Sequence, residues 1–411
     1  MRKTAVYVLF VFLLLTACTQ AEHKTVMCVP VYGQSLALGE EAALITDFDS
    51  LSERVVTENL DRRFGYYDVN KRKQTLKKLL HYQKRVFELS VYGMAEFLVG
   101  QLGNDTMVCI FPGGQGATPI AYLSKGQPPY ERFLEDIRTA YNKAVDKEWD
   151  FQVPAVCWMQ GESDLFDYTG VDYKAMLYQF QQDISRDIRS ITHQKNDVRI
   201  VCYQTNLVSN AVHFQPMSYD CVETAVPQAM MELVRDDSMF WASAPTYPYS
   251  FARELKHIDG VSQKRLGFLA AQSVLGIIRG DRQRQQGLVP LTAVSEDTVI
   301  CLRFSVPCPP LMLDTVLVKN PGHYGFSVIT PQNEDILKTV SLSGDSIILT
   351  CSRPTSGCKV RYAVNGERLK SGWEKGPRGN LRDSQPAVTF IQGTAYPSHH
   401  WCYQFDLLLN P

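Results

Sequence analysis

A serine that could act as a nucleophile follows the first apolar segment of the chain. The run Val26–Tyr32 leads directly into Gly33-Gln34-Ser35. Ligands of open α/β sheets bind at the carboxyl ends of the strands, so a serine on a turn there would present its hydroxyl at that edge. A helix starting at this turn would direct free backbone N–H groups toward an oxyanion. Taken alone, the pattern also fits a turn serine that caps a helix.

A base that could activate this serine has to come from another part of the chain. Of the eight histidines, His257 and His213 are candidates, because the others fall in the N-terminal segment, in polar helical surroundings or in the C-terminal region. Only His257 has an acid at a matching spacing, Glu254, and residues three apart can meet on one side of a turn. Taken alone, His257 also fits an ordinary loop histidine.

Two further segments place polar or flexible residues after predicted strands. The segment Trp158–Asp164 contains Gln160 and Glu162, which would lie at the same sheet edge as the serine. The segment Phe111–Gly116 has three glycines in four positions, which let the backbone approach a ligand closely. No Gly-Lys-Ser/Thr follows these glycines, which excludes a phosphate loop. Each segment alone is also consistent with a simple strand end or turn.

Together, and in this order, these segments resemble the SGNH hydrolases, most closely their sialate O-acetylesterase and carbohydrate acetyl-esterase branch. That branch carries Gly-Gln-Ser, then Trp-x-Gln-Gly-Glu-x-Asp, then Asp-x-x-His. Residues 33–35 and 158–164 match the first two blocks fully, whereas Glu254 stands where the third block has Asp before His257. The resemblance covers roughly residues 25–280.

The resemblance implies a Ser-His-acid mechanism. Ser35 would be the nucleophile and His257 the general base and later acid, with a carboxylate that orients the imidazole. By spacing, that carboxylate is Glu254. In some acetyl esterases of this branch the glutamate of Gln-Gly-Glu serves instead, so Glu162 competes with it. Asp259 is a poorer match to the Asp of the third block, because no histidine follows it three residues later.

The resemblance also implies an oxyanion hole. Its candidate donors are the backbone N–H of Ser35, a backbone N–H of Gly113 or Gly114, and the side-chain amide of Gln160. Gln34 is a further candidate for binding the oxyanion or the substrate. Loss of one such donor typically lowers turnover by about 10²–10³.

The elements that would position these residues alternate between strands and helices. Nearly continuous apolar runs predict parallel strands buried on both faces at 26–32, 107–111, 155–159, 199–203 and 239–242. Amphipathic patterns predict helices at 76–98, 130–145 and 173–191. The alternation predicts an α/β domain over residues 25–283. The resemblance implies that this domain is a three-layer, flavodoxin-like SGNH parallel sheet. The segment 48–74 lacks a strong period and is expected to be an insertion or lid.

The pattern changes after Arg279. The polar segment Gly280–Gly287 indicates a linker or interdomain loop, and short strands with Pro, Gly, Asn and Asp turns follow from Leu288. No helix-length pattern interrupts them. The sequence therefore predicts a C-terminal β-sandwich accessory domain over residues 284–411. Such a domain could bind sugar or brace the catalytic domain.

The first 17 residues predict a lipoprotein signal peptide. The apolar run Ala5–Ala17 follows a basic start and is shorter than the roughly 20 residues of a membrane span. Leu15-Thr16-Ala17-Cys18 resembles the lipobox of bacterial lipoproteins, which implies lipidation of Cys18, although plain signal cleavage stays open. We expect residues 18–24 to be a tether and the protein to be an exported, membrane-anchored lipoprotein of the periplasm or cell surface.

Eleven cysteines suit an exported protein, but their positions divide them into groups. Cys18 is the lipidation candidate, and four others fall inside predicted strands, where we expect small buried hydrophobes: Cys28, Cys109, Cys157 and Cys202. Cys221 is undecided. Any disulfide is expected among the five in the C-terminal region, Cys301, Cys308, Cys351, Cys358 and Cys402.

Composition excludes several functional classes. With 42 Lys and Arg against 43 Asp and Glu, the net charge of −1 argues against a dedicated nucleic-acid binder. The spacing of His and Cys favours no metal site, and no dinucleotide fingerprint occurs, so no cofactor is expected.

The resemblance and the predicted export together favour a serine esterase that removes O-acetyl groups from a glycan, either sialic acid or an acetylated polysaccharide. Two alternatives stay open. One is a non-catalytic glycan-binding lipoprotein, for which the Asp-to-Glu replacement at Glu254 is the only support. The other is an SGNH lipase or peptidoglycan esterase.

Overall fold

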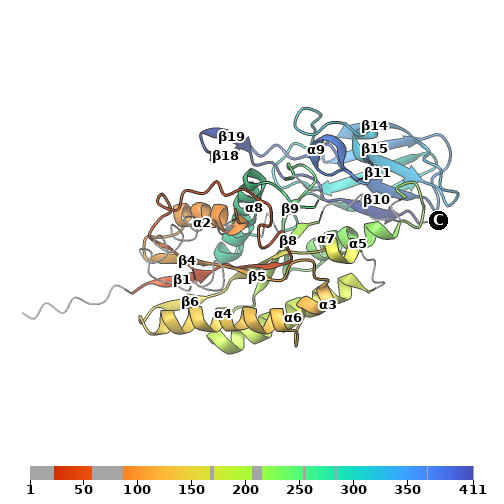
Figure 1. The fold of residues 1–411 in the computed structure, drawn as a ribbon. Coiled ribbons are helices and arrows are strands. Elements are labelled where there is room, and N and C mark those ends of the chain that lie inside the picture. Colours follow the sequence, from red (N-terminus) through yellow and green to blue (C-terminus); the bar gives the residue numbers. More distant parts are fainter. Residues whose placement is uncertain are drawn as a thin grey trace, which may run out of the picture.

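Figure 1 shows the fold of the protein as a computed structural model. The structure describes residues 23–57, 87–166, 171–205, 215–252, 256–282, 285–367 and 369–410. The predicted signal peptide, Cys18, His213 and Glu254 lie outside these residues. Within the described ranges, no helix is both long and apolar enough to cross a membrane.

The first part of the chain forms a parallel sheet whose strands are buried along most of their length. Its strands are β1 (Thr25–Cys28), β2 (Val31–Gly33), β3 (Val55–Thr57), β4 (Thr106–Ile110), β5 (Pro112–Gly114), β6 (Asp150–Gln152), β7 (Ala155–Met159), β8 (Arg199–Gln204) and β9 (Phe240–Pro245). The pairs β1/β2, β4/β5 and β6/β7 follow each other directly and act as interrupted strands. The order across the sheet is therefore β3, β4/β5, β1/β2, β6/β7, β8, β9. Apart from the edge strand β3, this is the flavodoxin-like order, which confirms the predicted fold class.

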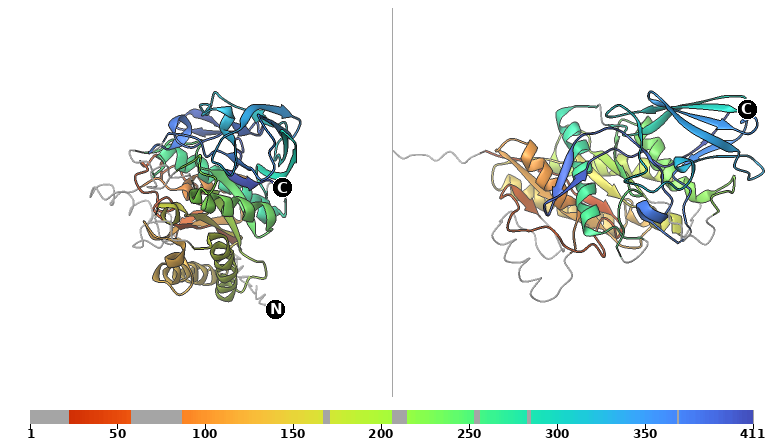
Figure 2. Two further views of the ribbon diagram at one scale, coloured as in Figure 1. Left: turned by 90° about the vertical axis from the view of Figure 1, so that its right-hand side faces the viewer. Right: turned by 90° about the horizontal axis from the view of Figure 1, so that it is seen from above.

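Helices cover both faces of the sheet and complete three layers (Figures 1 and 2). On one face lie α4 (Pro128–Val145), α6 (Tyr173–Thr192) and α7 (Ala225–Asp236), and on the other lie α2 (Ser90–Gln101) and α8 (Gly260–Arg279). Two short helices, α3 (Ile120–Leu123) and α5 (Glu162–Phe166), follow β5 and β7. In α8, a Cβ on Gly267 would lie 1.9 Å from the Ser90 carbonyl oxygen, so glycine permits the close packing of α8 on α2.

The segment before α2 differs from its prediction. The expected helix over 76–98 begins only at Ser90, because Phe87 forms an antiparallel bridge with Ala43 and Leu89 is extended. Residues 76–86 lie outside the described part of the chain. Within the expected insertion, residues 55–57 form β3, which pairs in parallel with β4 and extends the sheet by one edge strand.

The C-terminal part is built from antiparallel sheets. Four strands follow the order β10 (Val289–Glu296), β11 (Val299–Ser305), β15 (Ser346–Cys351), β14 (Leu337–Ser343), and three follow β13 (Phe326–Ile329), β16 (Lys359–Tyr362), β20 (Phe405–Leu408). The two sheets share a core in which the rings of Phe304 and Phe405 lie 6.2 Å apart. Two small pairs, β12 (Met312–Leu313) with β17 (Leu381–Arg382) and β18 (Val388–Ile391) with β19 (Thr394–Pro397), and the short helix α9 (Gly372–Lys375) complete this part.

The two parts of the chain are joined by a continuous buried interface. One hydrophobic cluster runs from the sheet and the α4, α6 and α7 layer into the C-terminal core. Gln204, at the end of β8, donates to the Gln404 carbonyl and accepts from the Gln404 N–H, at 2.8 and 2.7 Å. The buried Tyr403 hydroxyl donates to the Cys202 carbonyl and accepts from the Ser243 N–H. The C-terminal part therefore packs directly against β8 and β9 through buried hydrogen bonds and a shared hydrophobic core.

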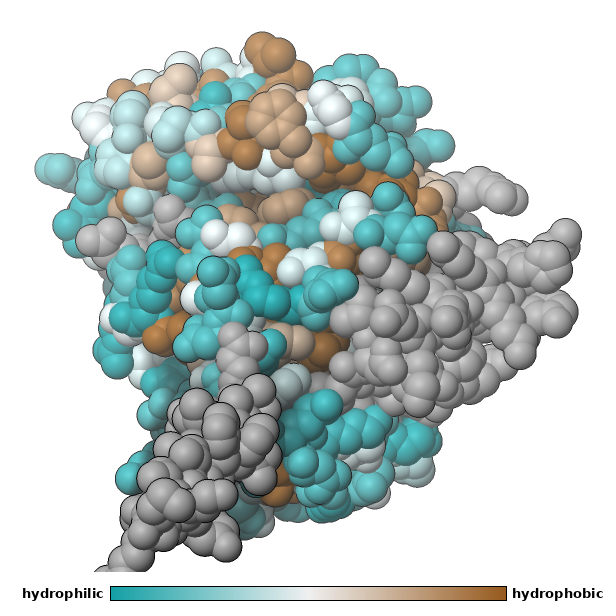
Figure 3. All heavy atoms as spheres, turned by 90° about the vertical axis from the view of Figure 1, so that its left-hand side faces the viewer, coloured by the Kyte–Doolittle hydropathy of each residue, from teal (hydrophilic) through white to brown (hydrophobic). Residues whose placement is uncertain are grey.

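The surface of the C-terminal part carries exposed apolar residues on the β18–β19 hairpin. Val388 is 49% and Phe390 67% exposed. In Figure 3, hydrophobic residues gather in the upper part of the molecule, which the C-terminal part forms in Figure 1.

The cysteines within predicted strands are buried, as expected. They lie in β1, β4, β7 and β8: Cys28, Cys109, Cys157 and Cys202. None of the five cysteines of the C-terminal part forms a disulfide in the structure. The four buried strand cysteines thus contribute small apolar side chains to the core of the sheet.

The interface predicts a specific loss of stability for Tyr403→Phe. Removing the hydroxyl leaves a buried N–H and a buried carbonyl without their shared partner, which costs about 1–3 kcal/mol in the free energy of unfolding. Tyr122→Phe is the matched control, because Tyr122 is 60% exposed and should change stability by less than about 0.5 kcal/mol. Urea unfolding of both variants checks this. Equal midpoints for the two variants would contradict a stabilising role for the Tyr403 hydroxyl.

Candidate functional site

The nucleophile candidate lies where three strand ends converge. Gly33 ends β2 between β5 and β7, and a Cβ on it would lie 1.9 Å from the Met159 carbonyl oxygen. Gly114 has a φ of 109°, and a Cβ there would lie 1.9 Å from the Gly33 carbonyl oxygen. A Cβ on Gly113 would lie 2.4 Å from the Phe133 ring. These glycines therefore allow the close backbone packing that sets Ser35 at the carboxyl edge of the sheet.

Ser35 and His257 meet at this edge. The Ser35 Oγ lies 2.9 Å from the His257 Nε2, and the two residues are 5% and 8% exposed. His257 belongs to the loop between β9 and α8, which closes through a Phe251–Ile258 bridge and a hydrogen bond from the Ala252 N–H to the His257 carbonyl. The geometry is that of a serine hydroxyl donating to an imidazole nitrogen.

The carboxylate that contacts the other imidazole nitrogen is one that sequence reasoning missed. Glu41 Oε2 lies 3.1 Å from His257 Nδ1, and the neighbouring Glu40 Oε2 lies 3.8 Å from Nε2. With a proton on Nδ1 donated to Glu41, Nε2 can accept a hydrogen bond from the Ser35 hydroxyl. Glu41 has a φ of 64°, which residues with a Cβ seldom adopt, and no periodic pattern predicts it. The only sequence signal is a pair of acids shortly after the Gly-Gln-Ser segment.

A buried acid holds the chain next to Glu41. Glu88 is fully buried, and its carboxylate accepts hydrogen bonds from the N–H groups of Ile45 and Thr46 and from the Thr46 hydroxyl, at 2.6 to 2.9 Å. Burial raises the pKa of Glu88, while these hydrogen bonds and Lys264 oppose the rise. The loop that carries Glu41 is thus anchored to the start of the α2 segment.

The two sequence candidates for the orienting acid have different outcomes. Glu254 lies outside the described residues. Glu162 is buried, and its Oε1 accepts from the Tyr203 hydroxyl at 2.5 Å and the Thr205 hydroxyl at 2.6 Å. Burial raises the pKa of Glu162, and the hydrogen bonds from Thr205 and Tyr203 oppose that rise. Asp259 caps α8 by accepting from the Ser262 N–H, so it serves the helix rather than the imidazole.

The structure places the Gln160 side chain, a predicted oxyanion donor, in a buried hydrogen-bond network. Its side chain is fully buried, and its amide nitrogen donates to Asp164 Oδ2 at 2.5 Å and to the Thr118 carbonyl at 3.3 Å. Its amide oxygen accepts from the Tyr173 hydroxyl at 2.8 Å. Both amide hydrogens are therefore engaged. The direction of a buried amide depends on partners distant in sequence, which the motif alone does not reveal.

Gln34 lies between the nucleophile and α5. Its side-chain oxygen accepts from the Ser163 N–H at 3.2 Å, and the residue is 3% exposed. The side-chain oxygen is therefore occupied as an acceptor, and the amide nitrogen carries the N–H groups that can donate to a ligand. Gln34 thus links the turn that carries Ser35 to the segment after β7.

No group of three or more His, Cys, Asp or Glu within the described residues has the arrangement of a metal site. The chemistry available from the residues assembled here is acyl transfer through a hydroxyl, an imidazole and carboxylates.

Several solved structures are similar to this protein in fold. A carbohydrate acetylesterase from Xanthomonas citri, XAC1771, superposes with a TM-score of 0.62 at 13% identity, over 93% of this chain and 80% of that one. A protein of Arabidopsis thaliana matches 62% of this chain and 98% of its own with a TM-score of 0.45 at 15% identity. NanS matches 64% of this chain and 99% of its own with a TM-score of 0.44 at 14% identity. The first similarity shows that the fold is shared across both parts of the chain.

Comparison of the sequence gives the family. Curated protein sequences give no significant match. A family model described as "carbohydrate esterase, sialic acid-specific acetylesterase" matches residues 33–276, which spans Ser35, the segment 158–164 and His257. The chain therefore belongs to the sialic acid-specific acetylesterase family of carbohydrate esterases.

Proposed function

We propose that this carbohydrate esterase is a serine hydrolase that removes O-acetyl groups from a glycan, with Ser35 as nucleophile and His257 as general base. The observation that carries the proposal is the 2.9 Å contact between Ser35 Oγ and His257 Nε2 at the carboxyl edge of the sheet. A serine hydroxyl becomes an effective nucleophile when an adjacent base takes its proton. The hydrogen-bonded pair also argues against a non-catalytic glycan-binding protein.

The proposed reaction has two acyl-transfer steps. Ser35 Oγ attacks the acetyl carbonyl while His257 Nε2 takes the hydroxyl proton, and a tetrahedral oxyanion forms. The C–O bond to the sugar breaks, Nε2 returns the proton to the sugar oxygen, and an acetyl-Ser35 ester remains. Water then attacks this ester with the same base, releasing acetate and restoring the serine.

We propose Glu41 as the acid that orients His257. A carboxylate on Nδ1 fixes the tautomer and stabilises the imidazolium that forms during each step. Glu41 makes this contact at 3.1 Å, and Glu88 anchors the chain beside it. Glu254 and Glu162 stay the alternatives, and the substitutions below distinguish the three.

The oxyanion is proposed to bind to backbone N–H groups at the strand ends. The Ser35 N–H, at the start of the turn after β2, is the first donor, and the backbone of Gly113–Gly114 on the adjacent strand supplies the second. The amide nitrogen of Gln34 is the side-chain candidate, because its oxygen is already held by Ser163. Donors held in place before the reaction avoid a reorganisation cost in the transition state.

The substrate is proposed to be an acetylated glycan outside the cytoplasm, either sialic acid or a polysaccharide. The family to which the chain belongs supports the acetylated carbohydrate. The signal-like start and the Leu15–Cys18 motif support export and lipid anchoring at Cys18. Acetate release from O-acetylated sialic acid and from neutral acetylated polysaccharides decides between the two substrates.

Ser35→Ala tests the assignment of the nucleophile. We expect the wild type to release acetate from p-nitrophenyl acetate and from at least one acetylated glycan, and the variant to fall to background because no acyl-enzyme can form. Acetate and p-nitrophenol release are measured side by side, with circular dichroism to verify folding. If a folded Ser35→Ala protein retains wild-type turnover, the serine hydrolase assignment fails.

Glu41→Gln tests the assignment of the orienting acid. The isosteric amide cannot stabilise the imidazolium, so we expect kcat to fall by about 10²–10⁴ with KM nearly unchanged. Glu254→Gln and Glu162→Gln are made in parallel, and kcat is measured on p-nitrophenyl acetate. A larger fall in kcat for either of these than for Glu41→Gln would assign the role to that residue instead.

A further inference from the structure

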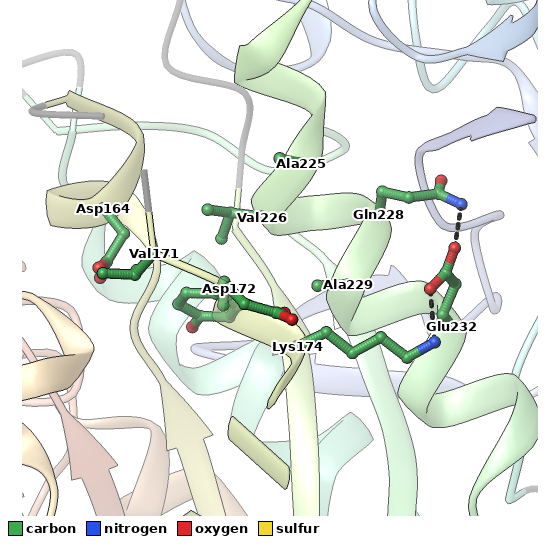
Figure 4. A pocket seen from close by; sticks show the side chains of 10 residues that line it. Asp164, Val171, Asp172, Lys174, Ala225, Val226, Gln228, Ala229 and Glu232 are labelled. Carbon is green, nitrogen blue, oxygen red and sulfur yellow. Dashed lines mark hydrogen bonds and ion pairs between the residues drawn. The ribbon is translucent and has the colours of Figure 1, made fainter. Parts of the chain in front are cut away.

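A cavity of about 270 Å³ opens between the first turns of α6 and α7 (Figure 4). Both helices run antiparallel to the strands, so their first turns lie at the same carboxyl edge of the sheet as Ser35. Asp164 of α5 forms one end of the cavity, and Lys174, Gln228 and Glu232 form the other. The proposed mechanism does not use this cavity.

Short contacts link the cavity to the strand ends that carry the nucleophile. Asp164 Oδ2 accepts from the amide of Gln160 and from the Ile120 N–H, and the preceding Ser163 N–H donates to Gln34. Gln34 directly precedes Ser35 in the chain. The five-residue helix α5 therefore connects the wall of the cavity to the turn that carries Ser35.

The lining of the cavity suits a ring with hydroxyl groups. Asp164 is only 2% exposed, yet its Oδ1 has no hydrogen-bond partner within the described part of the chain. A buried carboxylate oxygen without a partner is costly, and a ligand hydroxyl would satisfy it. Val226 and Ala229 lie between the two polar ends in Figure 4 and offer an apolar wall.

The charges around the cavity disfavour an anionic ligand. Three carboxylates line it, those of Asp164, Asp172 and Glu232, against a single ammonium group. That ammonium, on Lys174, is already paired with Glu232 at 2.6 Å, and Glu232 also accepts from Gln228. The cavity lining therefore carries more carboxylates than ammonium groups. This excess of negative charge and of hydrogen-bond acceptors favours a neutral ligand that donates hydrogen bonds.

The α7 wall is held by the C-terminal part of the protein. Gln228 accepts from the Asp406 N–H at 2.8 Å, and Asp406 accepts from the fully buried Arg361 and from the Thr224 hydroxyl. Arg361 also donates to the carbonyls of Pro216, Ser218 and Tyr219, which lie just before α7. The cavity thus has a preformed wall, which lowers the ordering cost of binding.

We propose that this cavity is a subsite for one neutral sugar unit of the substrate, next to the unit that carries the acetyl ester. The inference rests on the proposed esterase function and names the substrate class: a neutral acetylated oligosaccharide or polysaccharide. The volume lies just below the roughly 300–1,000 Å³ typical of drug-sized ligand pockets, which suits a single ring.

Ala225→Trp tests the subsite. Ala225 is an exposed residue at the first position of α7 and lines the cavity, so an indole there blocks the cavity without entering the core. Val145→Trp is the matched control, because Val145 is 49% exposed at the end of α4, at the opposite edge of the sheet. The substrates are p-nitrophenyl acetate, an acetylated methyl xyloside, acetylated xylotetraose and acetylated tetragalacturonate.

We expect Ala225→Trp to raise KM for acetylated xylotetraose about ten-fold, a loss of about 1.4 kcal/mol in binding. Its kinetics on p-nitrophenyl acetate and on the monosaccharide should match those of Val145→Trp and the wild type, and the wild type should prefer xylotetraose to tetragalacturonate. An unchanged KM for xylotetraose in Ala225→Trp overturns the subsite. A preference for tetragalacturonate overturns the neutral class. If the wild type shows no activity on p-nitrophenyl acetate, the esterase function itself is refuted, and this result is distinct from failure of the subsite.

Discussion

Close backbone contact at Gly33 is the constraint on which the site depends. The strand ends of β2, β5 and β7 converge there so tightly that a side chain at residue 33 or 114 would collide with a neighbouring backbone. The Gln34 N–H donates to the Met159 carbonyl at 3.0 Å, which ties the following turn to β7. Ser35 is thereby fixed at the point where the strand order reverses, where open α/β sheets bind ligands. Backbone contacts therefore hold the turn that carries the serine.

The remaining parts of the site are brought to this point by long-range contacts. The loop of His257 spans β9 and α8, and the segment of Glu41 is anchored by the buried Glu88. The C-terminal part holds the ends of β8 and β9 through Tyr403 and Gln404. We therefore regard it as a structural layer of the catalytic unit.

Much of this architecture could be predicted from local patterns, and the exceptions have physical reasons. Continuous apolar runs predicted the central strands because both of their faces are buried, and the block order identified Ser35 and His257 as a pair. Glu41 escaped prediction because it reaches the imidazole through a left-handed turn. The hydrogen bonds of the Gln160 amide could not be predicted from the motif, because the residues that bind it, Thr118 and Tyr173, come from other elements. Helix α2 begins at Ser90, later than the sequence pattern predicts, because Phe87 forms a β-bridge with Ala43.

The central claim is that His257 activates Ser35 as a nucleophile, and covalent labelling tests it most directly. The wild type and a His257→Asn variant are treated with diisopropyl fluorophosphate, and the modified peptide is located by mass spectrometry. We predict a single phosphorylated residue, Ser35, with a labelling rate that falls at least a hundred-fold in the variant. Labelling at another serine, or an equal rate in the two proteins, would contradict the account.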